Sequence, residues 1–250
     1  MAKNPQYKRN TIQEAYCEFR LTPNSAPKWT PKTPGQIFKA LGPDKFPGME
    51  PLNEMMLNVV VDANGQAQQQ IVPQPPKVKF SNGDDTRLVQ VSPVMFAFNV
   101  VKDYPGWEKF QELITSNWDA VSPHLEPVAI ERIGLRYINR IPAPASSNIA
   151  DWLKPSRFIP EALKISNPTV KYRFEYTPKS SDAVVINIIR ESGGPFGTDI
   201  YFDIDYGRNI GSNINSSELK KITDLLHTEI WEIFDSAKAP KLESFLNGKD

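Results

Sequence analysis

The pattern of hydrophobic and polar residues along this chain is strongest between Ile130 and Ile141. Arg132, Arg136 and Arg140 stand four residues apart there, and so at positions of the same parity, with mainly apolar residues between them. Successive side chains of a strand point to opposite faces of its sheet. We therefore expect a strand with guanidinium groups on one face and a buried opposite face. The residues expected on the buried face are Ile133, Leu135, Tyr137 and Ile141.

Similar alternation predicts further strands on both sides of this stretch. The predicted strands cover 15–21, 78–80, 87–92, 95–101, 170–176, 184–190 and 198–206, with a weaker candidate at 57–61. Asn82-Gly83 lies between two of them, and Asn-Gly adopts the positive backbone angles of a tight hairpin at little cost. The spacing of these segments is typical of antiparallel strands joined by turns.

Two long amphipathic helices are predicted from apolar residues at three- and four-residue spacing. The first runs from Trp107 to about Val121, and the second begins near Asn215 or Ser216. Shorter helices are predicted at 33–41, where a hydroxyl residue precedes proline, and at 149–153 and 241–246. Each long helix requires a sheet or another helix to cover its apolar stripe.

The order of these elements predicts an α+β protein built from two similar units. Each unit reads as strand, short helix, three strands and long helix, over 1–125 and 126–250, with a Pro-rich insertion near 62–76. We expect the units to join in one globular domain with an antiparallel, curved sheet. The long helices are expected to pack on one face of that sheet and to leave the other accessible.

Composition narrows the functional classes. The chain has 250 residues, of which 40% are hydrophobic and 23% charged, as in ordinary globular proteins. Its 29 basic and 29 acidic residues give a net charge of zero, so no global field favours nucleic acid or a membrane surface. Cys17 is the only cysteine, and no signal peptide or membrane span is predicted. We expect a cytoplasmic protein without a cofactor.

Charged residues of the second unit fall on the face opposite the expected core. The candidate ligand- or partner-binding residues are Arg132, Arg136, Arg140, Lys171, Arg173, Asp199, Asp203 and Asp205. Guanidinium rows suit bidentate contact with carboxylates or phosphates, which is one interpretation. The other is that opposite charges pair across neighbouring strands. Alternation favours the second interpretation slightly, and the strand order decides between them.

No catalytic residue and no metal site is predicted. Asp203 and Asp205 share a face and suit a divalent cation, but the pattern indicates no further ligands. His124 and His227 are far apart, and Cys17 is expected to be buried, so neither a metal triad nor a thiol nucleophile is indicated. Phosphate-binding glycine loops are also absent from the sequence. An enzyme is therefore not the favoured class.

Two motifs carry a family resemblance. Residues Tyr104 to Phe110 read Tyr-Pro-Gly-Trp-Glu-Lys-Phe, and Arg132 to Ile141 read Arg-Ile-Gly-Leu-Arg-Tyr-Ile-Asn-Arg-Ile. With Leu226-His227 and residues near the start, they resemble a sporadically distributed, functionally uncharacterised prokaryotic family of about this length. The resemblance implies a prokaryotic accessory protein without an assigned activity. A patchy distribution is typical of antiviral defence and toxin–antitoxin modules.

These observations lead to one hypothesis and two alternatives. The favoured hypothesis is a non-catalytic recognition module that binds a protein partner, such as the product of an adjacent gene, or an anionic ligand. One alternative is a phosphate-handling hydrolase in which the three arginines clamp phosphate while Asp203 and Asp205 hold Mg²⁺. The other is a homo-oligomeric scaffold. Nucleic acid and membranes are not expected partners.

Overall fold

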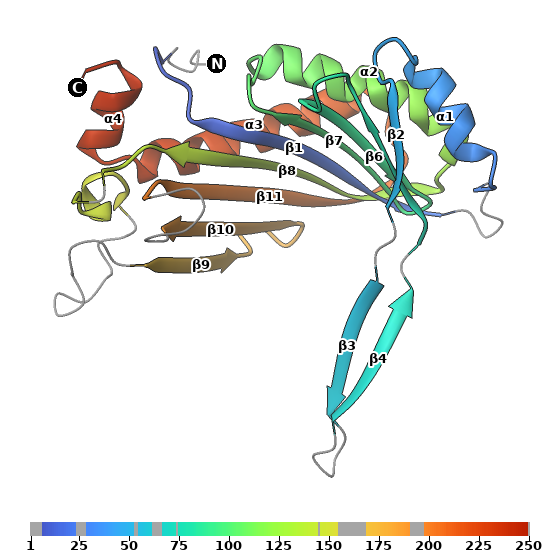
Figure 1. Ribbon diagram of the computed structural model, residues 1–250, viewed down its shortest axis with the longest axis horizontal. Coiled ribbons are helices and arrows are strands. Elements are labelled where there is room, and N and C mark those ends of the chain that lie inside the picture. The colour runs from blue at the N-terminus through green and yellow to red at the C-terminus, as the bar shows by residue number, and fades with distance from the viewer. Residues whose placement is uncertain are drawn as a thin grey trace.

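A nine-stranded antiparallel sheet forms the centre of the protein (Figure 1). The computed structural model describes residues 7–23, 29–52, 55–61, 67–73, 75–144, 146–154, 169–190 and 198–249. In sheet order the strands are β2 (Gly48–Leu52), β5 (Lys77–Ser81), β6 (Arg87–Ser92), β7 (Met95–Val101), β1 (Ile12–Thr22), β8 (Ala129–Ile141), β11 (Ile200–Ser212), β10 (Asp182–Arg190) and β9 (Val170–Tyr176). The predicted α+β class is confirmed.

The two halves of the chain meet at β1 and β8, in the middle of the sheet. β1 pairs with β7 on one side and with β8 on the other, and β8 in turn pairs with β11. Tyr16 therefore lies between Asn99 of β7 and Arg136 of β8. Strands from the first half lie on one side of this junction, and strands from the second half lie on the other.

The first half contains more strands than the sequence predicted. β2 was not expected, and β3 (Met55–Val61) pairs with β4 (Ala67–Pro73) in a separate two-stranded sheet that extends away from the main one (Figure 1). The Pro-rich insertion near 62–76 contains a strand at 67–73 that the sequence did not predict. β4 has three successive glutamines, so it lacks the apolar alternation that marks a strand. The element order of the first half thus differs from the predicted one.

Four α-helices and one 3₁₀ helix complete the described structure. They are α1 (Thr33–Leu41), α2 (Trp107–Leu125), η1 (Ile149–Asp151), α3 (Ser216–Ala237) and α4 (Pro240–Leu246). α3 begins with a capping box, in which the Asn215 side chain accepts from the Glu218 backbone N–H and the Glu218 carboxylate accepts from the Asn215 N–H. None of the described helices is long and apolar enough to span a membrane.

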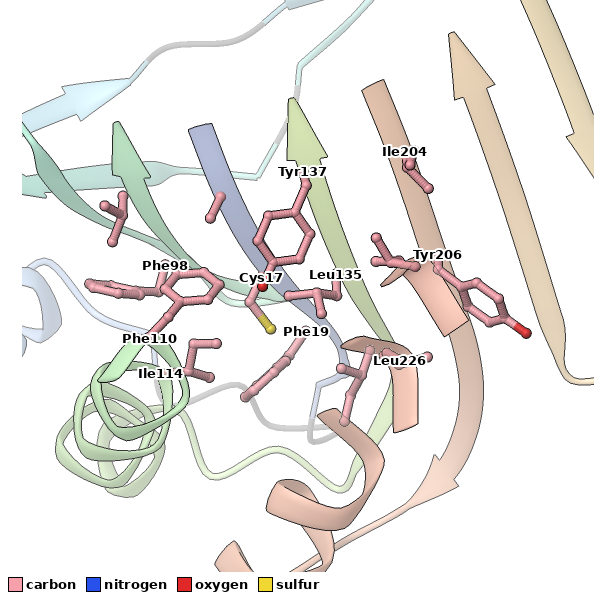
Figure 2. Packing of buried hydrophobic residues seen from close by; sticks show 14 of the residues in the cluster. Cys17, Phe19, Phe98, Phe110, Ile114, Leu135, Tyr137, Ile204, Tyr206 and Leu226 are labelled. Carbon is pink, nitrogen blue, oxygen red and sulfur yellow. The ribbon is translucent and has the colours of Figure 1, made fainter. Parts of the chain in front are cut away.

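The core lies between the sheet and the long helices. α2 contacts β7, and α3 contacts β8 and β11. Phe110 and Ile114 of α2 and Leu226 of α3 converge on the same group of sheet residues, which includes Phe19 and Leu135 (Figure 2). The predicted buried face of β8 is confirmed, since Ile133, Leu135, Tyr137 and Ile141 are all buried.

Residues from the two family-like motifs gather where α2 begins beside α3. The Trp107 ring stacks on His227 with ring centroids 4.2 Å apart, and its Nε1–H donates to Asp224 at 2.8 Å. The Tyr137 ring of β8 lies 6.1 Å from His227, and its hydroxyl is 2.9 Å from that of Tyr104. This cluster ties both helices to the central strand. It gives the motifs a structural role.

Burial lowers the pKa of the His227 imidazole to about 4, from an ordinary value of 6.5, although Asp224 and Glu108 favour the charged form. The folded protein therefore holds His227 neutral at pH 7. Unfolding exposes the imidazole, which then takes up a proton at any pH below about 6.5.

We expect His227 to make the protein sensitive to mild acid. Because the unfolded state binds the additional proton between pH 6.5 and pH 4, stability should fall as the pH decreases across this window. The loss should be on the order of 3 kcal/mol at most. Urea unfolding of His227→Phe and of the unaltered protein at several pH values measures this loss of stability. Parallel stability curves for the two proteins would contradict the assignment.

Candidate functional site

A polar surface covers the face of β1, β8 and β11 that is opposite the core. On β1, the buried residues Ala15, Cys17 and Phe19 alternate with residues that point the other way. Directly paired residues in an antiparallel sheet share a face, and Tyr16, Arg136 and Asp205 form one such row across the three strands. The register therefore brings side chains from both halves of the chain together.

Three arginine–aspartate ion pairs join β8 to β11 and to Asp199, the residue that precedes β11. They are Arg132 Nη2 to Asp205 Oδ1 at 3.2 Å, Arg136 Nε to Asp203 Oδ1 at 2.7 Å, and Arg140 Nε to Asp199 Oδ2 at 2.5 Å. Each arginine reaches diagonally, toward the C-terminal end of β8, past the residue directly opposite it. The interpretation in which the arginines pair across neighbouring strands is thus the one that the structure shows.

Of the three ion pairs, the one between Arg136 and Asp203 makes the most hydrogen bonds. The guanidinium donates twice to the carboxylate, through Nε at 2.7 Å and Nη2 at 2.9 Å, and Asn187 Nδ2 donates to it at 2.9 Å. The Asp203 side chain is only 8% exposed. The bonds to Asp203 raise the pKa of Arg136 above its ordinary value. This cation is already bound within the sheet.

Arg132 lies in a slot that two glycines create. Gly134 and Gly207 are directly opposite one another on β8 and β11. A Cβ atom added to Gly207 would lie 2.0 Å from Arg132 Nη2, and one added to Gly134 would lie 2.5 Å from Nη1. The guanidinium therefore fills space that two side chains would otherwise occupy, and this position brings it within reach of Asp205.

Beside this slot lies a cavity of about 220 Å³, which we name the charged hollow. Its lining residues are Glu14, Tyr16, Glu18, Arg20, Asn99, Arg132, Gly134, Arg136 and Asp205. Hydrogen bonds hold several of these side chains in place. Asn99 Nδ2 donates to Glu14 at 2.6 Å, the Tyr16 hydroxyl donates to Glu18 at 2.7 Å, and Arg20 Nε donates to Glu18 at 3.1 Å.

Burial shifts two ionisations in the hollow. It raises the pKa of the Asp205 carboxyl, although Arg132 and Arg136 both favour the charged form. Burial and the neighbouring Glu18 raise the pKa of the Tyr16 hydroxyl well above its ordinary value, so Tyr16 stays a neutral donor. The negative charge of Asp205 is thus incompletely compensated, while its side chain remains about one third exposed, at 34%.

The structure separates the predicted binding residues into three groups. Arg132, Arg136 and Asp205 line the charged hollow, whereas Arg140, Asp199 and Asp203 lie outside its lining. Lys171 and Arg173 are on β9, at the edge of the sheet, with β10 and β11 between them and β8. These two residues therefore belong to a different surface.

Six lining residues were missed by the sequence-based prediction. They are Glu14, Tyr16, Glu18, Arg20, Asn99 and Gly134. Alternation already indicated that Glu18 and Arg20 face away from the core. It contained no sign that β1 neighbours β8, because strands more than a hundred residues apart are paired by tertiary contacts.

The arrangement gives little support to a metal centre. Within the described part of the chain, no group of three or more His, Cys, Asp or Glu side chains is placed to hold a metal ion. Asp203 and Asp205, which would hold Mg²⁺ in the hydrolase alternative, each accept a hydrogen bond from an arginine. The hollow offers hydrogen-bonding groups of both charges and a fixed geometry.

We expect Gly207→Ala to destabilise the protein by about 1 to 3 kcal/mol, because the added methyl group overlaps the Arg132 guanidinium. Urea unfolding measures the change. Gly35→Ala is the matched control, since no atom lies within 4 Å of its added Cβ, and it should leave stability unchanged or slightly raised. In an Arg132→Ala background the cost of Gly207→Ala should largely disappear. An equal cost in both backgrounds would contradict the placement of the Arg132 guanidinium beside Gly207.

Arg136 and Arg140 should differ in their contribution to stability. Arg136→Ala removes the bidentate partner of a nearly buried carboxylate, and we expect a loss of about 2 to 3 kcal/mol. Arg140→Ala removes a partly exposed pair and should cost less than about 1 kcal/mol. Chemical denaturation of both variants makes the comparison, and similar losses would show that Asp203 does not depend on Arg136.

Two comparisons with known proteins found no match. No family model matches the chain, and no curated protein sequence matches it significantly. The resemblance to an uncharacterised prokaryotic family remains a prediction from the motifs. Any functional assignment therefore depends on the geometry of the sheet.

Proposed function

We propose that the charged hollow is a recognition surface for a protein partner and that the protein acts as a non-catalytic recognition module. The observation that carries this proposal is a preformed cavity at the junction of β1 and β8, lined by charged side chains on the face opposite the core. Internal hydrogen bonds hold these side chains, so binding would cost little ordering of the surface.

The charges in the hollow favour a protein partner over a small anion. Arg136 is already bonded to Asp203, and Arg132 lies in its slot against Asp205. By contrast, Asp205 is incompletely compensated, and Glu14 accepts a hydrogen bond from the neutral amide of Asn99. A lysine or arginine side chain of a partner would complement these carboxylates. Arg20, at 61% exposed, is placed at the rim to meet an acidic residue of the same partner.

The proposal includes a duplicated origin for the two halves. In each half the first strand pairs with the strand that precedes a long helix, as β1 does with β7 and β8 does with β11. The antiparallel β1–β8 pair then relates the halves by an approximate two-fold axis. We place both long helices on the core side of the sheet, which leaves the polar face open to a partner.

The cellular setting is proposed from the sequence alone. One buried cysteine suits a reducing cytoplasm. The family resemblance suggests that the partner is the product of an adjacent gene, as in antiviral defence or toxin–antitoxin pairs. No feature of the hollow favours the metal-dependent hydrolase, because Asp203 and Asp205 already bind arginines. The homo-oligomer alternative concerns a different surface, the edge at β9.

The proposal predicts that hollow variants lose partner binding while the fold is retained. We would co-express the protein with the products of the adjacent genes and measure affinity for the captured product by calorimetry. Arg20→Glu and Tyr16→Phe should each weaken binding by about tenfold, since each removes one hydrogen-bonding or charged contact. Both variants should retain the thermal unfolding midpoint to within a few degrees.

Glu112→Lys is the matched control for these variants. Glu112 is 63% exposed on α2, where it pairs with Lys109, and it lies outside the hollow. Its charge reversal should leave affinity unchanged. If Arg20→Glu and Tyr16→Phe bind the partner as tightly as the unaltered protein does, the hollow is not the recognition surface.

A further inference from the structure

The β9 strand forms one edge of the main sheet. It pairs with β10 in an uninterrupted register, from Val170 opposite Arg190 to Tyr176 opposite Val184. Among the described strands, none pairs with its outer side. β9 contains neither a proline nor a bulge, whereas Pro51 lies in β2 at the opposite edge. Proline and bulges are common means of blocking an edge, so the β9 edge lacks a usual protection.

The two faces of β9 carry different chemistry. Tyr172, Phe174 and Tyr176 form a stacked ladder, with successive ring centroids 6.1 Å and 6.4 Å apart, and Tyr176 is 54% exposed. Arg173 and Glu175 stand on the other face, where they are 58% and 65% exposed and pair with each other at 2.6 Å within the strand. Partly exposed aromatic rings on an open edge are unusual in a monomeric sheet and indicate an interaction surface.

The sequence of β9 is self-complementary about Phe174. On either side of it stand residues of opposite charge, Arg173 and Glu175, and beyond them the identical residues Tyr172 and Tyr176. Two antiparallel copies with Phe174 opposite Phe174 would place Arg173 opposite Glu175 of the second copy, twice. The same register would place Tyr172 opposite Tyr176. Opposite charges and aromatic rings are both favourable cross-strand pairs.

Neighbouring registers match less well. Centring the pair on Arg173 would set two guanidinium groups directly opposite each other at the axis. Shifting one copy by a single residue would bring the aromatic face of one strand beside the charged face of the other. The register centred on Phe174 pairs Arg173 with Glu175 twice and sets no like charges opposite each other, whereas the register centred on Arg173 pairs Lys171 with Glu175 twice but sets Arg173 opposite itself.

We propose that the protein forms a two-fold dimer in which the β9 edges of two copies pair antiparallel, with Phe174 on the axis. The long helix α3 permits this approach. It contacts β8 and β11, and β10 separates β11 from the β9 edge. With strands ~4.8 Å apart, the two β11 strands would lie roughly 24 Å apart across the interface. This surface is separate from the charged hollow, so the dimer and the recognition surface are independent proposals.

Charge reversal on β9 tests the pairing directly. Sedimentation analysis over a concentration series should show a dimer for the unaltered protein. Arg173→Glu and Glu175→Arg should each weaken dimerisation by about tenfold or more, because two cross-strand attractions become repulsions. An equimolar mixture of the two variants should regain the dimer, since one carries two cations and the other two anions at these positions. The double variant should also dimerise.

Glu50→Arg is the matched control, because Glu50 is an exposed, ion-paired residue of the opposite edge strand. It should leave the dimer unchanged. The proposal is overturned if the unaltered protein remains monomeric, or if both single variants dimerise normally. It is also overturned if mixing fails to restore the dimer, because the single losses would then reflect damage to the strand rather than lost pairing.

The register has its own test. Phe174→Cys would place two thiols opposite each other at the axis, so a short bifunctional maleimide should join two copies. Tyr172→Cys sets its thiols on opposite sides of the axis, four residues out of register, and should give far less product. The native Cys17 is fully buried, and the unaltered protein measures any background from it. Equal crosslinking at both positions would overturn the proposed register.

Discussion

The pairing of β1 with β8 joins two strands that are more than a hundred residues apart in the chain, and much of the molecule depends on it. Cys17 lies opposite Leu135 and Phe19 opposite Ile133 on the core side, while Tyr16 lies opposite Arg136 on the polar side. Since side chains alternate, one register decides both faces at once. A slip by one residue would move arginines into the core, where an unpaired charge is costly.

The same constraint explains the character of the charged hollow. Its lining residues come from β1, β7, β8 and β11, and the slot where Gly134 meets Gly207 lies beside it. The ion pairs between β8 and β11 neutralise most of the cationic charge that the sequence presents. What stays incompletely compensated is carboxylate, chiefly Asp205. The proposal of a donor-bearing protein partner, rather than phosphate, is based on this distribution of charge.

The hollow and the β9 edge bear a simple geometric relation. In an antiparallel pairing of two sheet edges, the two-fold axis is perpendicular to the sheet, so equivalent faces of both copies point the same way. The proposed dimer would thus present two hollows on one side of a continuous sheet. Such an arrangement suits a partner that is itself two-fold symmetric or that offers two equivalent sites.

The local pattern of apolar and polar residues predicted those strands and helices in which it repeats regularly. The alternation in 15–21 and 130–141 predicted both the strands and their buried faces, and apolar spacing predicted α2 and α3. The glutamine-rich β4 and the proline-containing β2 were not predicted, because their residues lack the apolar alternation that is typical of a strand. Pairing with a neighbouring strand stabilises them instead.

By itself the sequence determined which residues face the core and which face away, because that choice follows from periods of two and 3.6 residues. It placed Arg132, Arg136 and Arg140 in one row and left open what they meet. Only the tertiary structure decided that β11 and the residue before it supply their aspartates, that β1 supplies the other wall of the hollow, and that two glycines make room for Arg132. Strand order is a long-range property, and no local period encodes it.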